Sequence, residues 1–239
     1  HYNYRDHRKI AVVDGQVAFT GGVNLADEYI NRVVRFGHWK DTAVMLRGEA
    51  VRSFTLMFLN MWAIDEHAME ASRFLAYPTK PAMDAPGFVL PYSDSPVDGN
   101  KVGEQVYIDI LSRARRYVHI MTPYLIIDHN METALQYAER GVDVHLILPG
   151  IPDKKYAFAL AHTHYASLMK AGVKISEYTP GFVHAKVFVA DDREAVVGTI
   201  NLDYRSLYHH FECAAYMLDV PCIADIEADF QHTLKQCRR

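Results

Sequence analysis

A histidine, a lysine and an aspartate with fixed spacing occur twice in the chain, and this repetition constrains the fold more than any other feature. Each copy reads His-x-Lys-x4-Asp and is followed by a glycine-containing bend and an asparagine. The matched positions keep one constant offset; they are His7 and His184, Lys9 and Lys186, Asp14 and Asp191, and Asn24 and Asn201. Two copies in one register are hard to obtain by accident, so the sequence predicts an internal structural repeat.

Each motif is expected to begin a β-strand. Residues two apart in a strand point to the same face, so His184 and Lys186 would project side by side. The apolar runs behind the motifs, residues 10–13 and 187–190, predict strands that are buried on both faces. An aspartate then opens a turn, and the returning strand ends in a small-residue bend that lets a ligand approach the backbone closely.

If the two copies face each other, one pocket holds two imidazoles, two ammoniums and two amides. Such donors suit the oxygens of a phosphoryl group. The candidate phosphate ligands are Lys9, Asn24, Lys186 and Asn201. One histidine can attack while the other supplies and removes protons. Because the lysines supply the positive charge, neither a metal nor another cofactor is expected.

The duplicated motif resembles the phospholipase D superfamily, and the surrounding sequence is similar to bacterial cardiolipin synthases within it. The segments that carry this similarity are residues 4–9, 19–24, 38–42, 122–124, 148–153 and 198–206. The resemblance runs along nearly the whole chain. It implies an α/β fold of two pseudosymmetric repeats, each a mixed β-sheet flanked by helices, with one active site shared between them.

Membership of the motif makes Asp14 and Asp191 candidate catalytic residues beside the two His-Lys pairs. A structural role in the turn behind each strand is the preferred interpretation. The resemblance further implies that Asp41 and Glu212 accept a hydrogen bond from a motif histidine and fix its tautomer. The two carboxylates lie at different distances from their motifs, so surface carboxylates on strands remain the alternative.

The chain divides at a proline-rich stretch. Residues 76–99 contain half of the ten prolines and are predicted to form a linker. Residues 1–75 would be the C-terminal part of a first phospholipase D-like repeat, and residues 100–239 a second repeat in which strands alternate with helices. Cardiolipin synthases carry membrane segments and further structure before the first motif, so the resemblance implies that this chain is a C-terminal fragment.

Composition limits the class of partner. Half of the residues are apolar and 23% are charged, and the net charge of −4 argues against a general polyanion binder, so no nucleic-acid partner is expected. The three cysteines lack metal-ligand spacing and suit a reducing compartment.

No apolar run approaches the roughly 18 residues of a membrane-spanning helix. Residues 49–66 predict a helix that packs on the sheet, with a membrane-touching helix as the alternative.

The resemblance implies a phosphatidyltransferase. One motif histidine, with His7 preferred, would attack phosphatidylglycerol and form a phosphatidyl-histidine intermediate. The other histidine would protonate the leaving glycerol and then deprotonate a second phosphatidylglycerol, giving cardiolipin. The implied partners are anionic phospholipid and a membrane surface, on the cytoplasmic side of a bacterial cell membrane. A phospholipase or phosphodiesterase that uses water, and a non-catalytic phospholipid-binding protein on the same fold, remain open.

Overall fold

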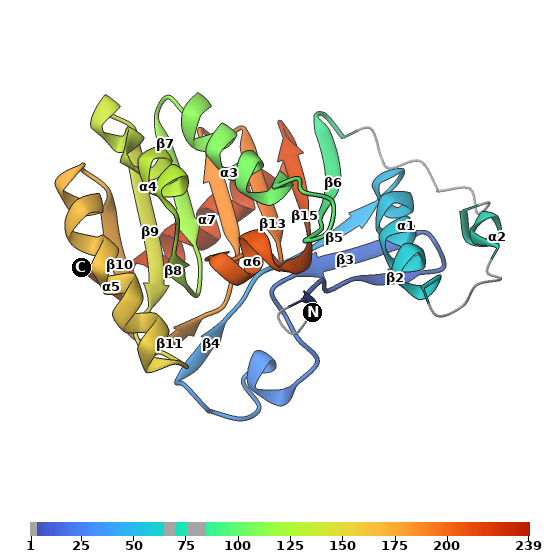
Figure 1. Ribbon diagram of the computed structural model, residues 1–239, viewed down its shortest axis with the longest axis horizontal. Helices are drawn as coiled ribbons and strands as arrows, with labels where there is room; N and C mark the ends of the chain where they lie inside the picture. The colour runs from blue at the N-terminus through green and yellow to red at the C-terminus, as the bar shows by residue number, and fades with distance from the viewer. Residues whose placement is uncertain (1–3, 65–69, 76–84) are drawn as a thin grey trace.

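The computed structural model describes residues 4–64, 70–75 and 85–239 of the chain. A mixed nine-stranded β-sheet forms its centre (Figure 1). The strand order is β1-β15-β13-β12-β7-β9-β10-β16. Strand β6 also pairs with β15, beyond the part of β15 that pairs with β1. These strands are β1 (Arg5–Asp6), β6 (Phe88–Asp94), β7 (Tyr117–Met121), β9 (Asp143–Pro149), β10 (Lys174–Tyr178), β12 (Val187–Ala190), β13 (Glu194–Gly198), β15 (His210–Leu218) and β16 (Cys237–Arg238).

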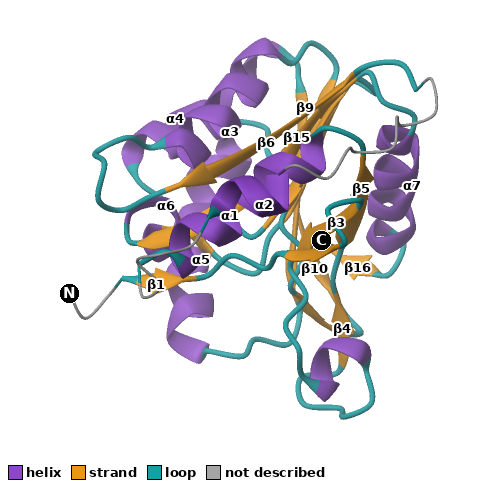
Figure 2. Cartoon of the chain, turned by 90° about the vertical axis from the view of Figure 1, so that its right-hand side faces the viewer, coloured by secondary structure: helices purple, strands orange, loops and turns teal. Residues whose placement is uncertain are grey.

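Helices cover both faces of this sheet, with α3, α4 and α5 on one face and α7 on the other (Figures 1 and 2). The helices and short elements of this part are α3 (Val102–Arg113), β8 (Leu125–Ile126), α4 (His129–Leu135), η2 (Gln136–Arg140), α5 (Lys155–Lys170), β14 (Leu202–Asp203), α6 (Tyr204–Tyr208) and α7 (Cys222–Leu234). No helix in the described part of the chain is long and apolar enough to cross a bilayer.

Successive side chains of β12 point to opposite faces of the sheet and contribute to the core on both sides. Val187 and Val189 pack in the cluster that includes α7, whereas Phe188 stacks on Tyr107 of α3 with ring centroids 3.9 Å apart. All four residues of β12 are buried. The prediction that residues 187–190 form a strand buried on both faces is therefore confirmed, whereas His184 and Lys186, expected to lie in this strand, precede it.

A smaller unit lies beside the large sheet. Its elements are β2 (Ala11–Val13), β3 (Val17–Gly21), η1 (Asp27–Ile30), β4 (His38–Lys40), β5 (Ala43–Arg47), α1 (Ala50–Trp62) and α2 (Ala71–Leu75). Strands β2, β3 and β5 form an antiparallel three-stranded sheet. Helix α1 buries Val51 and Phe54 in the core of this unit, which confirms that the predicted helix packs on the sheet. The end of the predicted helix, residues 65 and 66, lies outside the described residues.

The first motif strand departs from the prediction that it is buried on both faces. β2 lies at the edge of the small sheet, and Val13 is 52% exposed. Phe19 and Met45, which pair across β3 and β5, are exposed as well. An apolar run alone does not distinguish a central strand from an edge strand, and this explains the error.

Two strand pairs and a shared core hold the small unit on the large sheet. β4 pairs in parallel with β11 (Gly181–Val183), and β1 pairs in parallel with the start of β15. Ala18 and Phe54 pack with Cys213 of β15 in one apolar cluster. These contacts bring the two copies of the motif to one place.

The C-terminal part of the predicted linker belongs to the large sheet. Phe88–Asp94 pairs antiparallel with β15 along its whole length, so these residues form a strand within the stretch that was predicted to be a linker. Pro91 is tolerated because β6 is an edge strand, where a missing N–H breaks no ladder. Residues 76–84 lie outside the described residues, and the division of the chain into two repeats stays a prediction.

Candidate active site

Both motif histidines lie in short connections where the small unit meets the large sheet. His184 precedes β12, and its backbone N–H donates to the carbonyl oxygen of Lys40 at 2.7 Å. His7 follows β1, and its backbone N–H donates to the carbonyl oxygen of Phe211 at 2.9 Å. The main chain of the opposite predicted repeat therefore anchors each histidine.

The imidazole rings are held in the same crossed manner. His7 Nδ1 lies 2.9 and 3.0 Å from the two carboxylate oxygens of Glu212. His184 Nδ1 lies 2.8 Å from Asp41 Oδ2. An ionised carboxylate only accepts, so each Nδ1–H donates and each Nε2 keeps its lone pair. Both carboxylates thus accept a hydrogen bond from a motif histidine, and in each case the acceptor comes from the part of the chain that carries the other copy of the motif.

Glu212 is fully buried and remains ionised. The hydroxyls of Thr199 and Ser206 donate to its two oxygens. Burial alone would raise the pKa of Glu212, but the imidazoles of His210 and His7 beside it lower that pKa to about 2. Glu212 is therefore a constant acceptor for His7 at neutral pH.

Asp41 is the corresponding acceptor for His184. Burial would raise the pKa of Asp41, but the hydrogen bond from His184 and the charge of Lys186 hold it below its ordinary value. The N–H of Thr42 donates to Asp41 Oδ1 at 2.9 Å and fixes the carboxylate. Gly22 is required beside it, because a Cβ there would lie 2.0 Å from the same oxygen.

Each motif lysine contacts the main chain of its own histidine. Lys9 Nζ donates to the carbonyl oxygen of His7 at 2.6 Å, and Lys186 Nζ donates to that of His184. Lys186 is 1% exposed, and burial lowers its pKa to about 7 although neighbouring Asp41 opposes this change. Burial lowers the pKa of Lys9 as well. Two ammoniums in a site that disfavours their charge attract an anion, which would offset the lost solvation.

Aromatic rings enclose His184. Its ring centroid lies 5.2 Å from Tyr29, 5.3 Å from Trp39 and 5.9 Å from Phe182. The sequence did not single out these rings for this role. The available signal was the position of Trp39 within the family-like segment 38–42.

The two histidines have similar partners but different surroundings. The side chain of His184 is 9% exposed, whereas that of His7 is 24% exposed. Burial, followed by the charge of Lys186, lowers the pKa of His184 to about 4, against the opposing effect of Asp41. Burial also lowers the pKa of His7 from its ordinary value. The pseudosymmetry of the sequence therefore does not extend to the accessibility of the two rings.

The motif asparagines have different contacts. The backbone N–H of Asn201 donates to Ser206 Oγ at 2.9 Å, so Ser206 ties the Asn201 bend to Glu212. Asn201 Oδ1 is buried and makes no hydrogen bond with the described residues. Asn24 Nδ2 donates to the hydroxyl of Tyr29 at 2.5 Å. Asn24 is thus linked to the site through Tyr29, whose ring contacts His184.

The motif aspartates lie away from the histidines, which supports the structural interpretation and not a catalytic role. Asp191 follows β12 at the opposite end from Lys186, about 16 Å along an extended strand. Its carboxylate accepts hydrogen bonds from three main-chain N–H groups, those of Arg115, Arg116 and Tyr117. Asp14 occupies the corresponding turn after β2, and both aspartates have a positive φ, 52° and 54°.

Replacing Asp191 with asparagine is expected to destabilise the fold by about 1–3 kcal/mol and to leave the kcat of the folded protein unchanged. Burial would raise the pKa of Asp191, but the main-chain donors hold it below its ordinary value. The stabilisation is therefore complete above the ordinary pKa and disappears as the pH falls through the lowered one. Urea unfolding at several pH values measures this, with Asp14→Asn as the matched control. A large loss of kcat in Asp191→Asn would contradict the structural role.

Among the described residues, one group of side chains has the geometry of a metal site. Ligand atoms of His7, His210 and Glu212 all lie within 4.8 Å of one another. The ammoniums of Lys9 and Lys186 interact unfavourably with a charge on His7 and would oppose a dication in the same way. The cluster therefore fits a metal ion poorly.

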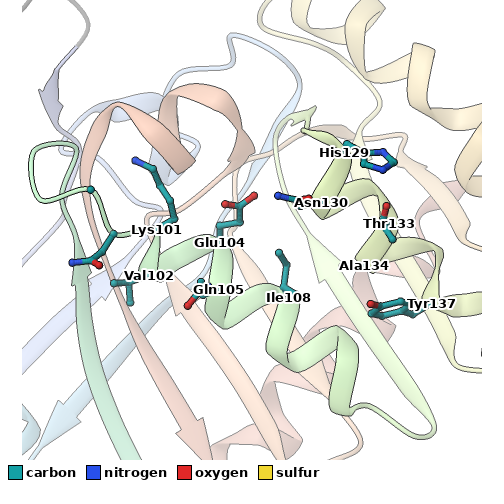
Figure 3. Close-up of a pocket in the computed structure, with 12 residues that line it drawn as sticks. Lys101, Val102, Glu104, Gln105, Ile108, His129, Asn130, Thr133, Ala134 and Tyr137 are labelled. Carbon is teal, nitrogen blue, oxygen red and sulfur yellow. The ribbon is translucent and has the colours of Figure 1, made fainter.

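A polar cleft of about 700 Å³ lies between α3 and α4 (Figure 3). Glu104 and Asn130 face each other across it, with Lys101 near one end and Tyr137 near the other. None of the motif residues is among those that line it. The cleft is therefore separate from the site of the two histidines.

Comparisons with known proteins identify the family of the chain. Residues 107–234, more than half of the chain, match the family model for a cardiolipin synthase, phospholipase D-like domain. The chain belongs to this family.

Relatives within and beyond the family cover almost the entire chain. An uncharacterized protein of Streptococcus mutans is 66% identical over 100% of this chain and 52% of its own length. A cardiolipin synthase of Geobacillus kaustophilus is 39% identical over 95% of this chain and 46% of its own. A phosphatidylserine synthase structure from Haemophilus influenzae shares the phospholipase D-like fold, with a TM-score of 0.73 at 17% identity over 98% of this chain and 63% of that one. The chain spans about half the length of the curated relatives it matches.

Proposed function

We propose that the protein containing this chain is a phosphatidyltransferase that makes cardiolipin from two phosphatidylglycerol molecules. The observation that carries this proposal is the crossed site itself. Two imidazoles each donate from Nδ1 to a buried carboxylate and keep a lone pair on Nε2, beside two ammoniums. A binding protein has no need of two imidazoles oriented in this way, whereas a two-step displacement needs both. The cardiolipin synthases among the relatives support the choice of substrate.

In the first step, His7 Nε2 attacks the phosphorus of phosphatidylglycerol, and the bond between phosphorus and the glycerol oxygen breaks. His184 gives a proton to that oxygen, so glycerol leaves and a phosphatidyl-histidine remains. In the second step, a hydroxyl of another phosphatidylglycerol gives its proton to His184 and attacks the phosphorus. The phosphorus–nitrogen bond then breaks, His7 is restored, and cardiolipin forms. Lys9 and Lys186, with Asn24 and Asn201, hold the non-bridging oxygens.

His7 is the proposed nucleophile because its ring is the more accessible of the two. His184 is enclosed, and its pKa of about 4 keeps it neutral in the empty site. A bound phosphodiester places a negative charge beside His184, which favours the imidazolium and raises its pKa. The substrate itself would thus convert His184 into the general acid that the first step needs.

The remaining expectations follow from the substrate. A site that takes phosphatidylglycerol must meet a membrane surface, and we place it on the cytoplasmic side of a bacterial cell membrane. The two lysines provide the positive charge that the transferring group requires, so the proposed reaction includes no metal or other cofactor.

Incubating the intact protein with phosphatidylglycerol vesicles in the presence of a chelator is expected to give cardiolipin and glycerol in equal amounts. The acceptor is a lipid hydroxyl, so each turnover releases one glycerol. Mass spectrometry of the lipids and an enzymatic glycerol assay measure both products. Phosphatidic acid without cardiolipin would reject the transferase and indicate a hydrolase. Vesicle binding with no product would indicate a non-catalytic phospholipid-binding protein.

A further inference from the structure

A third histidine lies beside the site, and neither the motif nor the proposed reaction uses it. His210 begins β15 and points to the same face as Glu212, because residues two apart in a strand share a face. Its Nδ1 lies 3.4 Å from Glu212 Oε1, the oxygen that accepts from His7 Nδ1 at 2.9 Å. The rings of His7 and His210 are 5.3 Å apart. One carboxylate therefore faces two imidazoles.

The surroundings of His210 make this contact significant. Both of its ring nitrogens are buried, and neither makes a well-oriented hydrogen bond with the described residues. A neutral imidazole always carries one N–H, and buried donors in native proteins normally find an acceptor. The acceptor within reach of Nδ1 is Glu212 Oε1, which His7 already uses. His210 and His7 therefore share one carboxylate, whose Oε1 also accepts from the Ser206 hydroxyl.

We propose that His210 is a positioning residue that sets the basicity of His7 by sharing Glu212 with it. A donor from His210 reduces the negative charge that Glu212 offers to His7, and a weaker acceptor stabilises the imidazolium of His7 less. His7 thereby stays neutral, and able to attack, to a lower pH. The link to rate rests on the proposed function, but the link to the protonation of His7 does not.

Other charged and titratable groups face this cluster and must be kept constant in any test. Glu212 acts on His7 from β15, Lys9 from the same connection as His7, and Lys186 from the connection before β12. Asp41 and Cys213 act on Lys9, and Tyr107 of α3 interacts with Glu212. The unaltered groups are Glu212, Lys9, Lys186, Asp41, Cys213 and Tyr107. Substitutions at His210 change none of these groups directly.

The test compares two replacements of His210 in the intact protein, in chelator-treated buffer. His210→Phe keeps a ring and removes both nitrogens, whereas His210→Asn keeps an amide donor near the position of Nδ1. Nitrogen NMR of labelled histidines follows the titration of His7 without substrate. In His210→Phe we expect His7 to titrate at higher pH, and in His210→Asn close to the native pH. If His210→Phe lacks the native circular dichroism spectrum, His210→Ala carries the same prediction.

The rate provides a second readout. The acidic limb of kcat/KM for cardiolipin formation is expected to move to higher pH in His210→Phe, with about a threefold lower rate at the acidic end and no change above neutrality. An unchanged titration of His7 in His210→Phe overturns the proposal, and so does an equal shift in both variants. Absence of cardiolipin with the expected NMR shift would reject the proposed reaction and keep the role of His210.

Discussion

Replacing either His7 or His184 with asparagine is expected to lower kcat for cardiolipin formation by about ten-thousandfold. In the proposed reaction each imidazole performs a step that the other cannot perform at the same time, so neither loss is compensated. Asparagine keeps a polar side chain of similar length near Nδ1 and removes the Nε2 lone pair. Steady-state product formation measures the loss. His162→Asn, on α5 and 45% exposed in its side chain, is the matched control and should retain native activity.

The same two variants identify the nucleophile. If His7 forms the phosphatidyl-enzyme, lipid labelled at phosphorus should remain attached in His184→Asn, where release lacks its general base. No label should attach in His7→Asn. Acid-quenched protein separated from lipid shows which variant carries the label. Label retained in His7→Asn alone would reverse the assignment of the two histidines.

Replacing Lys186 with methionine is expected to lower kcat/KM by a hundredfold or more while stabilising the folded protein. The loss of rate follows from removing a buried positive charge that faces the transferring phosphoryl group. The gain in stability follows from burial, because a methionine of similar length needs no solvation. A free energy of unfolding higher by on the order of 1 kcal/mol or more is expected below pH 7, where the ammonium form prevails.

The pH dependence of this gain has a definite sign. Lys186 has a lowered pKa of about 7 when folded, against an ordinary value of 10.5. Between these two values the unfolded chain holds more protons, so the native protein gains stability from this residue as the pH rises. The difference between native and Lys186→Met protein should therefore shrink above pH 7. Urea unfolding at pH 6 and pH 9 measures it, with the exposed Lys174→Met as the control. Lower stability in Lys186→Met at pH 6 would contradict the argument.

The sequence predicted the site in outline because the spacing within a motif is local information. His184 and Lys186 are two residues apart, which predicts that their side chains lie close together. The second copy of the motif predicts that two such pairs meet. Burial was predicted correctly for Val187–Ala190, which lies inside a large sheet. It was wrong for the strand with Val13, because edge position depends on neighbours that are distant in sequence.

The contacts between the segments that carry the two motif copies could not be predicted from one sequence. Nothing in the spacing of Asp41 or Glu212 shows which histidine each one contacts. The crossing results from two strand pairs that join distant segments. Ser206 and His210 contact Glu212 from nearby positions in the same segment of the chain. The two-residue period of a strand predicts that His210 lies beside Glu212. It does not predict that His7 contacts the same carboxylate.

The crossed carboxylates have a consequence for how a site with two copies of a motif tolerates damage. Two copies could replace each other only if each were complete in itself. Here Glu212 serves His7 and Asp41 serves His184, so each copy supplies the acceptor for the histidine of the other. A lesion at either carboxylate therefore disables a histidine in the copy that is intact. The two copies of the motif therefore provide no redundancy and form one working unit.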